Sequence, residues 1–260
     1  MKIQTFVVAC VLVLAVFLFA QRHSHRAEQP LISRVVDLSH SIRQGSPSFD
    51  RGEDLTTRTL SEYGKDGYFA RELTLPEHFS THVDAPAHFA RGAWTSDEIP
   101  AERLVRPLVV LEVAGRAQHD SDYLVSLDDV ANWEKQHGRI PPGAVVMAHT
   151  GWDRHWDSAP AFRNMDAQGV LHFPGYSLET AQFLVTARDA VGLGIDTLSI
   201  DAGQAHDFPV HRFTSTQGVY HIEAVANLEE VPPLGAMVVV GLAKLQGGSG
   251  SPARVLALIP

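Results

Sequence analysis

The sequence predicts an α/β protein with a curved, mostly β core and few helices. Three observations favour this class: short apolar or alternating runs recur along the chain, only two segments have a helical pattern, and the composition suits a folded domain. Of the 260 residues, 45% are hydrophobic and 20% are charged, which is ordinary for a globular protein. No internal repeat or low-complexity tract is visible, so residues 31–260 are expected to form a single domain.

The predicted strands are short runs rich in branched and aromatic residues, bounded by Gly, Pro and Ser. The segments 106–113 and 143–152 each contain a continuous apolar run, which is typical of strands that are buried on both faces. The strands are expected within residues 34–42, 68–75, 106–113, 143–152, 191–201, 235–245 and 254–259.

Two helices at most are expected. The segment SLDDVANWEKQHG begins with Ser126, a good N-cap residue, and ends with Gly138. Residues 177–190 repeat this arrangement, with Ser177 preceding an apolar stripe. The stripe consists of Leu178, Ala181, Phe183, Leu184 and Ala187.

The first twenty residues are not expected to belong to this fold. Lys2 precedes an unbroken apolar run from Phe6 to Ala20, which has the length of a long signal-peptide core or a short membrane anchor. Residues 21–30 have the composition of a polar linker. The domain is therefore expected to be exported, and to be held at the membrane if residues 1–20 are not cleaved.

Charge and cysteine content exclude several classes of protein. The formal net charge is −9 and no Lys/Arg cluster occurs, which argues against a nucleic-acid-binding surface. The single cysteine, Cys10, lies in the N-terminal segment, so neither a disulfide framework nor a thiolate metal site is expected. The sequence has no Gly-rich phosphate loop and no G-x-S-x-G motif, so nucleophilic-serine chemistry is unsupported.

The stretch EHFSTHVDAPAHF places His78, His82, Asp84 and His88 on even-numbered positions. On an extended strand, side chains of equal parity point to one face, whereas on a helix Asp84 would lie well around the cylinder. Pro86 also disfavours a continuing helix. The pattern therefore predicts a strand that presents four metal-capable groups together.

Imidazole and carboxylate groups without sulfur suit a borderline or hard divalent cation, with Zn²⁺ or Mn²⁺ the leading candidates. One strand rarely completes such a site, so further ligands are expected from a distant segment, and the richest segment offers His206, His211, His221 and Glu223. Composition alone, however, favours exposed loop positions for His211 and Glu223. A carboxylate that bridges two ions would hold them about 3.5 to 4 Å apart.

His88 follows the cluster beyond Pro86 and is predicted to act as a base beside the ligands. A histidine has a suitable pKa for this work, and attack of an activated water on an amide or lactam carbonyl requires a proton shuttle. Other candidates are assigned structural roles. These are His149, His155 and His172, expected to be surface or hydrogen-bonded residues, and Asp196 and Asp201, expected to be hydrogen-bonded structural residues.

The stretch HFSTHVDAPAHF resembles the H-x-G-T-H-x-D-x-P-x-H-[FY] motif of the metal-dependent cyclase family, which includes bacterial kynurenine formamidase (arylformamidase) and isatin hydrolase. Further landmarks of the family occur in the expected order. They are VVDLSHSI, TGWD, GIDTLSID, DFPVHR and EAVANLEEVP, and together they span roughly residues 35 to 259. On these motifs the chain is identified as a member of that family.

The resemblance implies a swivelling β/β/α fold and a homodimer or homotetramer. It implies that His78, His82 and Asp84 bind one or two metal ions, with Asp84 able to bridge them, and that His88 donates and accepts protons. The partner is then a small amide or lactam.

In the formamidases a later histidine and a glutamate twelve residues on complete the site, and His211 and Glu223 have this separation. The family's substrate-contacting aromatic residue corresponds, by its distance from the first strand, to Phe49. The chain departs from the pattern at Ser80, which replaces a glycine, and at Phe79, which adds bulk beside the metal. Phe49 stands where formamidases tend to carry tryptophan.

The leading hypothesis is metal-dependent hydrolysis of an amide, with an aryl formamide of the N-formylkynurenine type as the substrate. The alternative is an isatin-hydrolase-like lactamase that acts on a planar bicyclic ring, with Phe49 and Phe79 as stacking surfaces. A third hypothesis is an exported metal- or ligand-binding protein without turnover. Export is out of place in the cytoplasmic route that kynurenine formamidase serves, so the substrate is left open.

Overall fold

The computed structural model describes residues 31–50, 52 and 54–260, of which Arg34–Ile259 form one compact unit. The predicted leader at 1–20 and linker at 21–30 lie outside the described residues. Within the described ranges, none of the helices combines the length and the apolar character that crossing a bilayer demands.

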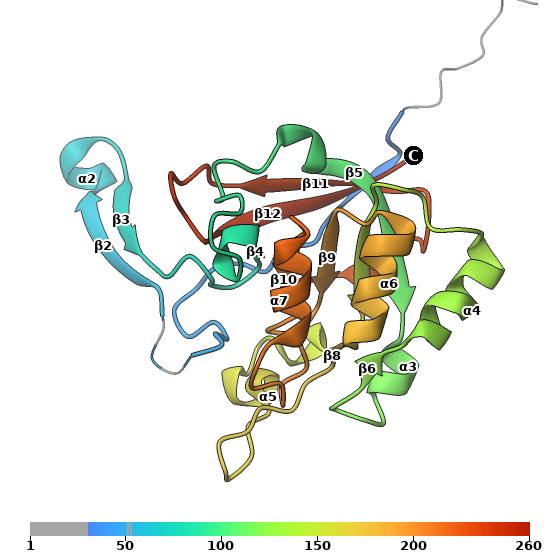
Figure 1. Ribbon diagram of the computed structural model, residues 1–260. Helices are drawn as coiled ribbons and strands as arrows, with labels where there is room; N and C mark the ends of the chain where they lie inside the picture. Colours follow the sequence, from blue (N-terminus) through green and yellow to red (C-terminus); the bar gives the residue numbers. More distant parts are fainter. Residues whose placement is uncertain (1–30, 51, 53) are drawn as a thin grey trace, which may run out of the picture. The chain divides into compact units, whose positions relative to one another are not determined.

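The unit is built on one eight-stranded sheet that closes on itself (Figure 1). Its strands are β1 (Arg34–Asp37), β4 (His82–Asp84), β5 (Val105–Glu112), β7 (Val145–His149), β9 (Gly192–Ile195), β10 (Tyr220–Glu223), β11 (Met237–Leu242) and β12 (Gly250–Ile259). The order is β1-β12-β11-β5-β7-β9-β10-β4, and β4 also pairs with β12. Because β4, at one end of this series, also pairs with β12 near the other end, the core is barrel-like, and the predicted curved β core is confirmed.

The predicted strands at 106–113 and 143–152 are confirmed as β5 and β7, which pair in parallel. Their residues alternate between two hydrophobic clusters: Leu108 and Met147 belong to a cluster shared with β4, β11 and β12, whereas Val109 and Val146 belong to a cluster shared with the helices. All four side chains are fully buried. An unbroken apolar run is what two buried faces demand.

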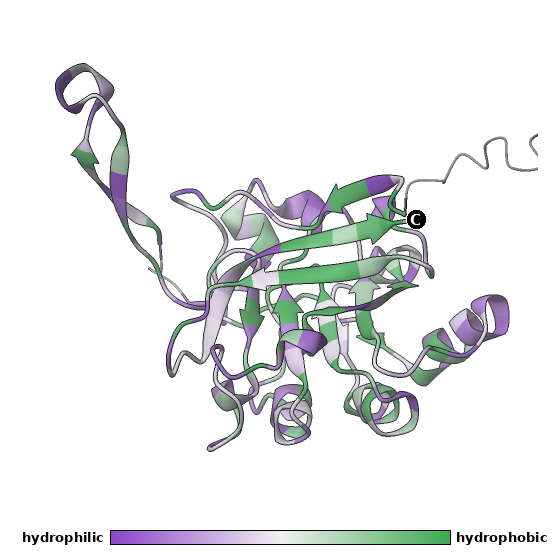
Figure 2. Cartoon of the chain, turned by 90° about the horizontal axis from the view of Figure 1, so that it is seen from above, coloured by the Kyte–Doolittle hydropathy of each residue, from purple (hydrophilic) through white to green (hydrophobic). Residues whose placement is uncertain are grey.

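Three helices lie side by side on one face of the sheet (Figure 1), and the view from above shows them beneath the apolar strands (Figure 2). They are α4 (Leu127–His137), α6 (Leu178–Arg188) and α7 (Pro209–Thr216). The N-caps expected at Ser126 and Ser177 are confirmed, since each side chain accepts a backbone hydrogen bond at the start of its helix. The expectation of two helices at most was wrong, because Pro209 starts α7 in a segment that the sequence pattern left undecided.

A hairpin arm extends from the body in both views (Figures 1 and 2). It consists of β2 (Thr56–Ser61), α2 (Tyr63–Asp66) and β3 (Ala70–Thr74), and β2 and β3 pair only with each other. The strand expected at 68–75 therefore lies outside the core sheet.

The remaining short elements are η1 (Pro86–His88), η2 (Ala101–Arg103), α3 (Ala114–Ala117), β6 (Leu124–Val125), η3 (Asp153–His155), α5 (Ala159–Arg163), β8 (Gly175–Tyr176) and η4 (Leu228–Glu230).

Candidate metal centre

The histidine cluster does not form the single long strand that its alternation predicts. Only His82 and Asp84 lie in β4, whereas His78 lies in the preceding loop and His88 ends the 3-10 turn η1. Two local features account for the difference. Ser80 adopts a left-handed conformation with φ of 61°, which breaks the extended chain, and η1 begins at a proline. The left-handed backbone is the one that glycine would supply at this position in the family motif.

The closing position of β4 brings distant ligand candidates together. β4 pairs antiparallel with β10, in a register that sets Glu223 opposite His82 and His221 opposite Asp84. On its other side β4 pairs with the start of β12, where Gly250 faces Asp84. A side chain at Gly250 would start only 2.6 Å from the His78 ring, so the glycine leaves room for that imidazole.

Asp84 lies at the centre of the cluster and is almost completely buried. Its Oδ1 lies 2.5 Å from His78 Nδ1 and 3.1 Å from His82 Nε2. Its Oδ2 lies 3.1 Å from His211 Nε2, which projects from α7. One carboxylate thus faces imidazoles of two separate segments through two different oxygens.

Glu223 is the second buried carboxylate of the centre. Its Oε1 lies 3.2 Å from His211 Nε2, and its Oε2 lies 3.5 Å from His82 Nε2. The Ile200 amide also donates to Oε1 at 2.9 Å, which fixes the carboxylate. The structure therefore brings His211 and Glu223 into the cluster, where composition alone had favoured exposed loop positions for both.

Two of the imidazole rings are each held in orientation by a hydrogen bond from one ring nitrogen. His82 Nδ1 lies 2.9 Å from the Ser80 carbonyl, and His211 Nδ1 lies 2.7 Å from Asp201 Oδ2. These partners accept hydrogen bonds, so each Nδ1 carries a proton, and in the neutral ring Nε2 keeps its lone pair. Both Nε2 atoms face Asp84 and Glu223. Histidines that bind metals in proteins are fixed in this way.

The same reasoning applies to His78. The Ser249 hydroxyl donates to Glu77 at 2.7 Å and lies 2.8 Å from His78 Nε2. Since that hydroxyl has one proton, Nε2 of the histidine is the donor to Ser249. Nδ1, the remaining nitrogen, faces Asp84.

His221 is a further donor that the sequence reasoning named in the segment but did not place among the ligands. It is fully buried on β10, and its Nε2 lies 2.7 Å from the Thr214 hydroxyl, which itself donates to the Val210 carbonyl. Its Nδ1 makes no hydrogen bond with any described residue and lies 3.9 Å from Asp84 Oδ2. His221 and Glu223 are two residues apart, so on a strand their side chains point to the same face, and this spacing could have indicated His221 as a ligand.

The centre has a strong electrostatic bias toward cations. Burial alone would lower the pKa of His82, but its hydrogen bond with Asp84 and the nearby Glu223 outweigh burial and raise this pKa to about 9. Burial likewise opposes protonation of His211, yet Asp201, Asp84 and Glu223 raise its pKa well above the usual value. For Asp84, burial favours the neutral form, but hydrogen bonds from the surrounding histidines hold its pKa well below the usual value. The Asp84 carboxylate therefore remains ionised although it is buried.

His88 stands beside the ligand candidates. Its ring stacks on His78 with 4.0 Å between centroids and lies 6.2 Å from the His211 ring. It is more exposed than the other histidines of the centre, and its ring makes no hydrogen bond with a described residue. Desolvation nevertheless lowers its pKa to about 4, and the positive charge on neighbouring histidines acts in the same direction, so the ring is neutral at pH 7 and can accept a proton.

Three aromatic rings form a row that begins beside His211. The Phe89 ring lies 4.6 Å from the His211 ring and 5.4 Å from Phe208, whose ring is 5.9 Å from Phe49. All three phenylalanines are half-buried. Phe79, by contrast, is completely buried, so the expectation that it offers a stacking surface was wrong.

The residues with expected structural roles divide into two kinds. Asp196 accepts from the amides of Thr150 and Trp152 and holds the loop after β7, as expected. Asp201 is hydrogen-bonded, also as expected, but its main partner is His211, so its role belongs to the centre. His206 is exposed and takes no part in the cluster.

The donor set fits a divalent cation. Imidazole nitrogens and carboxylate oxygens are ligands that Zn²⁺ and Mn²⁺ accept, and no sulfur is present among them. The donor atoms of His78, His82 and Asp84 lie within 4.8 Å of one another, and so do those of Asp84, His211 and His221. Two ligand groups share Asp84, which is the arrangement expected for a bridging carboxylate.

Comparisons with known proteins agree with this site. A curated isatin hydrolase from Roseibium aggregatum is 32% identical over 243 residues, covering 87% of this chain and 92% of that protein. A kynurenine formamidase from Salinibacter ruber is 23% identical, over 85% and 96% respectively. The solved structure of isatin hydrolase A from Ralstonia solanacearum has a TM-score of 0.83 at 32% identity, covering 87% of this chain and 92% of that one.

A further solved structure, an isatin hydrolase bound to the product analogue thioisatinate, has a TM-score of 0.83 at 29% identity. It covers 87% of this chain and 92% of its own. The family model described as "Putative cyclase" matches residues 36–202, which include the histidine cluster and Asp201. The chain belongs to this cyclase family, whose characterised relatives here are hydrolases of amide bonds.

Proposed function

We propose that this hydrolase opens an amide attached to an aromatic ring, using a divalent cation held at Asp84. The observation that carries the proposal is the orientation of the imidazoles. His82 and His211 each use one ring nitrogen for a hydrogen bond and direct the other at the same two buried carboxylates. Such a centre suits metal-assisted hydrolysis.

We propose that the cation is Zn²⁺ or Mn²⁺ and that the centre takes two ions. Asp84 Oδ1 faces His78 and His82, whereas Oδ2 faces His211, so each oxygen has its own set of nitrogen donors. A divalent cation held by these residues would lower the pKa of a water to roughly 7 and would polarise a carbonyl oxygen.

The chain's own groups complete the chemistry. His88 is neutral at pH 7 and sits against His78, so we assign it the proton transfers from the attacking water and to the departing nitrogen. Phe89 and Phe208 extend the wall toward Phe49, and this wall suits a flat aromatic ring next to the reacting carbonyl. We therefore again propose Phe49 as a substrate contact, with the Phe208 ring beside it.

Both substrate hypotheses remain within this proposal. The greater identity to isatin hydrolase, 32% against 23% for the Salinibacter formamidase, favours a cyclic amide fused to an aromatic ring. The aryl formamide is the second candidate, since the ligand candidates have the spacing of the formamidase motif. The position of His88 beside a complete set of donors argues against a protein that only binds metal or ligand.

The test uses the purified protein loaded with Zn²⁺ or Mn²⁺. Hydrolysis of isatin and of N-formylkynurenine is followed by absorbance, and the product of isatin opening is identified by mass spectrometry. Turnover of either substrate, abolished by chelation and restored by the metal, is the expected result. A metal-loaded protein that hydrolyses neither compound would contradict the substrate class.

We further propose that two copies of this chain assemble through the hairpin arm. The arm exposes Leu60, Tyr63, Tyr68, Phe69 and Leu73, and Tyr63 is 75% exposed. A lone two-stranded hairpin is marginally stable in water, so a surface that covers these side chains is required. A second copy supplies the same arm in return, which gives a closed pair.

We also propose export of the domain, on the evidence of the apolar run in residues 1–20.

A further inference from the structure

A second group of imidazole and carboxylate ligands lies at the ends of β5 and β7, and shares no residue with the centre around Asp84. His149 is the last residue of β7, Glu112 is the last residue of β5, and the two pair across the parallel ladder. Asp153 begins η3, and Glu229 lies in η4. Donor atoms of His149, Asp153 and Glu229 lie within 4.8 Å of one another.

His149 is oriented as a ligand would be. Its side chain is 9% exposed, and its Nδ1 lies 2.6 Å from Glu112 Oε2. The carboxylate accepts the Nδ1 proton, so in the neutral ring Nε2 keeps its lone pair. Nε2 makes no hydrogen bond with any described residue, and the nearest carboxylate oxygen is that of Glu229 at 3.9 Å. A distance of 3.9 Å is too long for a direct hydrogen bond and leaves space for an ion between the two atoms.

The surrounding charges favour a cation. Burial lowers the pKa of His149, but the hydrogen bond with Glu112 and the charges of Asp196 and Asp153 outweigh burial and raise this pKa above its usual value. The negative field that holds a proton here would equally hold a metal ion. Asp153 keeps its position because its Oδ2 accepts from the Asn227 amide at 3.2 Å.

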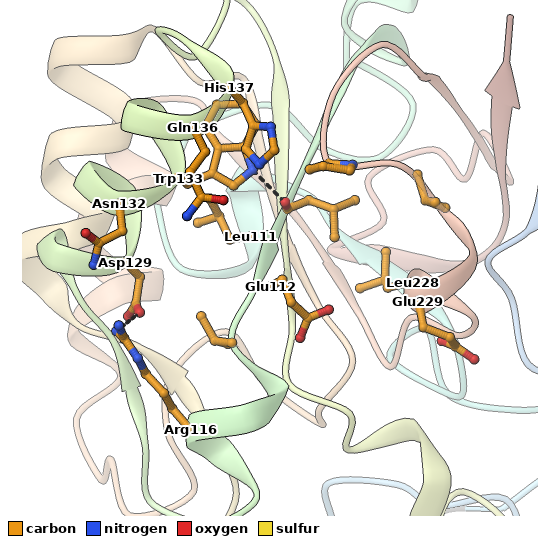
Figure 3. Close-up of a pocket in the computed structure, with 14 residues that line it drawn as sticks. Leu111, Glu112, Arg116, Asp129, Asn132, Trp133, Gln136, His137, Leu228 and Glu229 are labelled. Carbon is orange, nitrogen blue, oxygen red and sulfur yellow. Dashed lines mark hydrogen bonds and ion pairs between the residues drawn. The ribbon is translucent and has the colours of Figure 1, made fainter.

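Glu112 and Glu229 also line a groove of about 440 Å³ between β5, α4 and η4, whereas His149 and Asp153 do not line it. Glu112 extends from one side of this groove and Glu229 from the other (Figure 3). Trp133 lines the same groove, and its indole donates to the Val110 carbonyl. Three protein ligands and an open side are the arrangement of a metal site that keeps positions for water or for a small ligand.

We infer that His149, Asp153 and Glu229 form a second, independent site for a divalent cation of the zinc class, with Glu112 holding His149 in the ligand orientation. Glu112, His149 and the cation form the carboxylate–histidine–metal series that is common in zinc proteins. No local sequence pattern indicates this site, since the four residues are spread from position 112 to position 229.

The test counts Zn²⁺ in the full chain after chelator treatment, by titration against a chromophoric chelator. Wild-type protein is expected to bind one Zn²⁺ more per chain than Glu229→Gln. Glu112→Gln is expected to keep that site with an affinity 10- to 100-fold lower, because it removes only the partner of the ligand. Glu229 is exposed, so its substitution leaves the core intact, and circular dichroism checks this.

Glu230→Gln is the matched control, since it makes the same charge change one residue away on the same turn. It is expected to bind as much Zn²⁺ as the wild type. Equal Zn²⁺ content and affinity in Glu229→Gln and wild type would overturn the inference, and so would an equal loss in Glu230→Gln. Hydrolysis of isatin and of N-formylkynurenine is measured on the same samples, and this activity tests the Asp84 centre separately from the second site.

Discussion

Asp201→Asn tests how the chain holds His211 in place. Asp201 Oδ2 accepts from the His211 ring at 2.7 Å and from the His211 amide at 3.0 Å, and Oδ1 accepts from the Val210 amide at 2.9 Å. In asparagine one of these oxygens becomes an NH₂ group, which cannot accept a hydrogen bond. If it replaces Oδ2, the His211 ring must place its proton on Nε2, which faces the metal position. If it replaces Oδ1, a buried amide loses its partner at a cost of about 1–3 kcal/mol.

When a metal-binding histidine loses the hydrogen-bond partner that orients its ring, metal binding weakens about 10- to 100-fold, which corresponds to about 1.4 to 2.8 kcal/mol. The assay is a competition between the chain and a chelator of known affinity for Zn²⁺. Asp207→Asn, an exposed substitution just before α7, is the control and should match the wild type. A dissociation constant of Asp201→Asn within twofold of the wild type would refute the role given to Asp201.

Four further outcomes are expected. His88→Ala should retain its metal and lose about 10²- to 10⁴-fold in kcat, and unchanged turnover would remove His88 from the proton transfers. Asp84→Ala should lose the metal, as measured by elemental analysis, whereas full occupancy would contradict the shared carboxylate. The pKa of His82 is raised to about 9, so below that pH Zn²⁺ must displace a proton from this ring in order to bind. The apparent affinity for Zn²⁺ should therefore rise about tenfold per pH unit, from about pH 6 to about pH 9, for each proton that is displaced. A pH-independent affinity in calorimetry would contradict this. Phe69→Glu in the arm should shift the mass measured by light scattering from dimer to monomer, with Lys65→Glu as control, and an unchanged mass would exclude the arm as the contact.

The sequence predicts the buried strands well because two buried faces leave no room for polar residues. It predicts α4 and α6 equally well, because their serine caps and apolar spacing are local signals. It does not predict α7, whose eight residues are polar on one side and begin after Phe208 in a left-handed conformation. Such a start depends on packing and on the Asp201 carboxylate, which lies elsewhere in the sequence.

The alternation of the histidine cluster predicts the convergence of its side chains, but for a partly mistaken reason. The four groups converge although only two are in a strand, because a left-handed turn at Ser80 and the η1 turn redirect the other two. Convergence with His211 and Glu223 depends on strand pairing across the whole chain, so no local pattern could establish it. The resemblance to the family motif supplied that information instead.

The closing strand has a consequence for how the enzyme matures during synthesis. His82 and Asp84 pair with residues 250–252, about 170 positions later, and Gly250 packs against His78. A ribosome has therefore made about 250 residues before the earliest ligand candidates acquire their final neighbours, and contacts of such separation form slowly. We therefore expect metal to bind only after β12 has been made, and we expect a chain cut short before β12 to carry every predicted ligand without forming the centre.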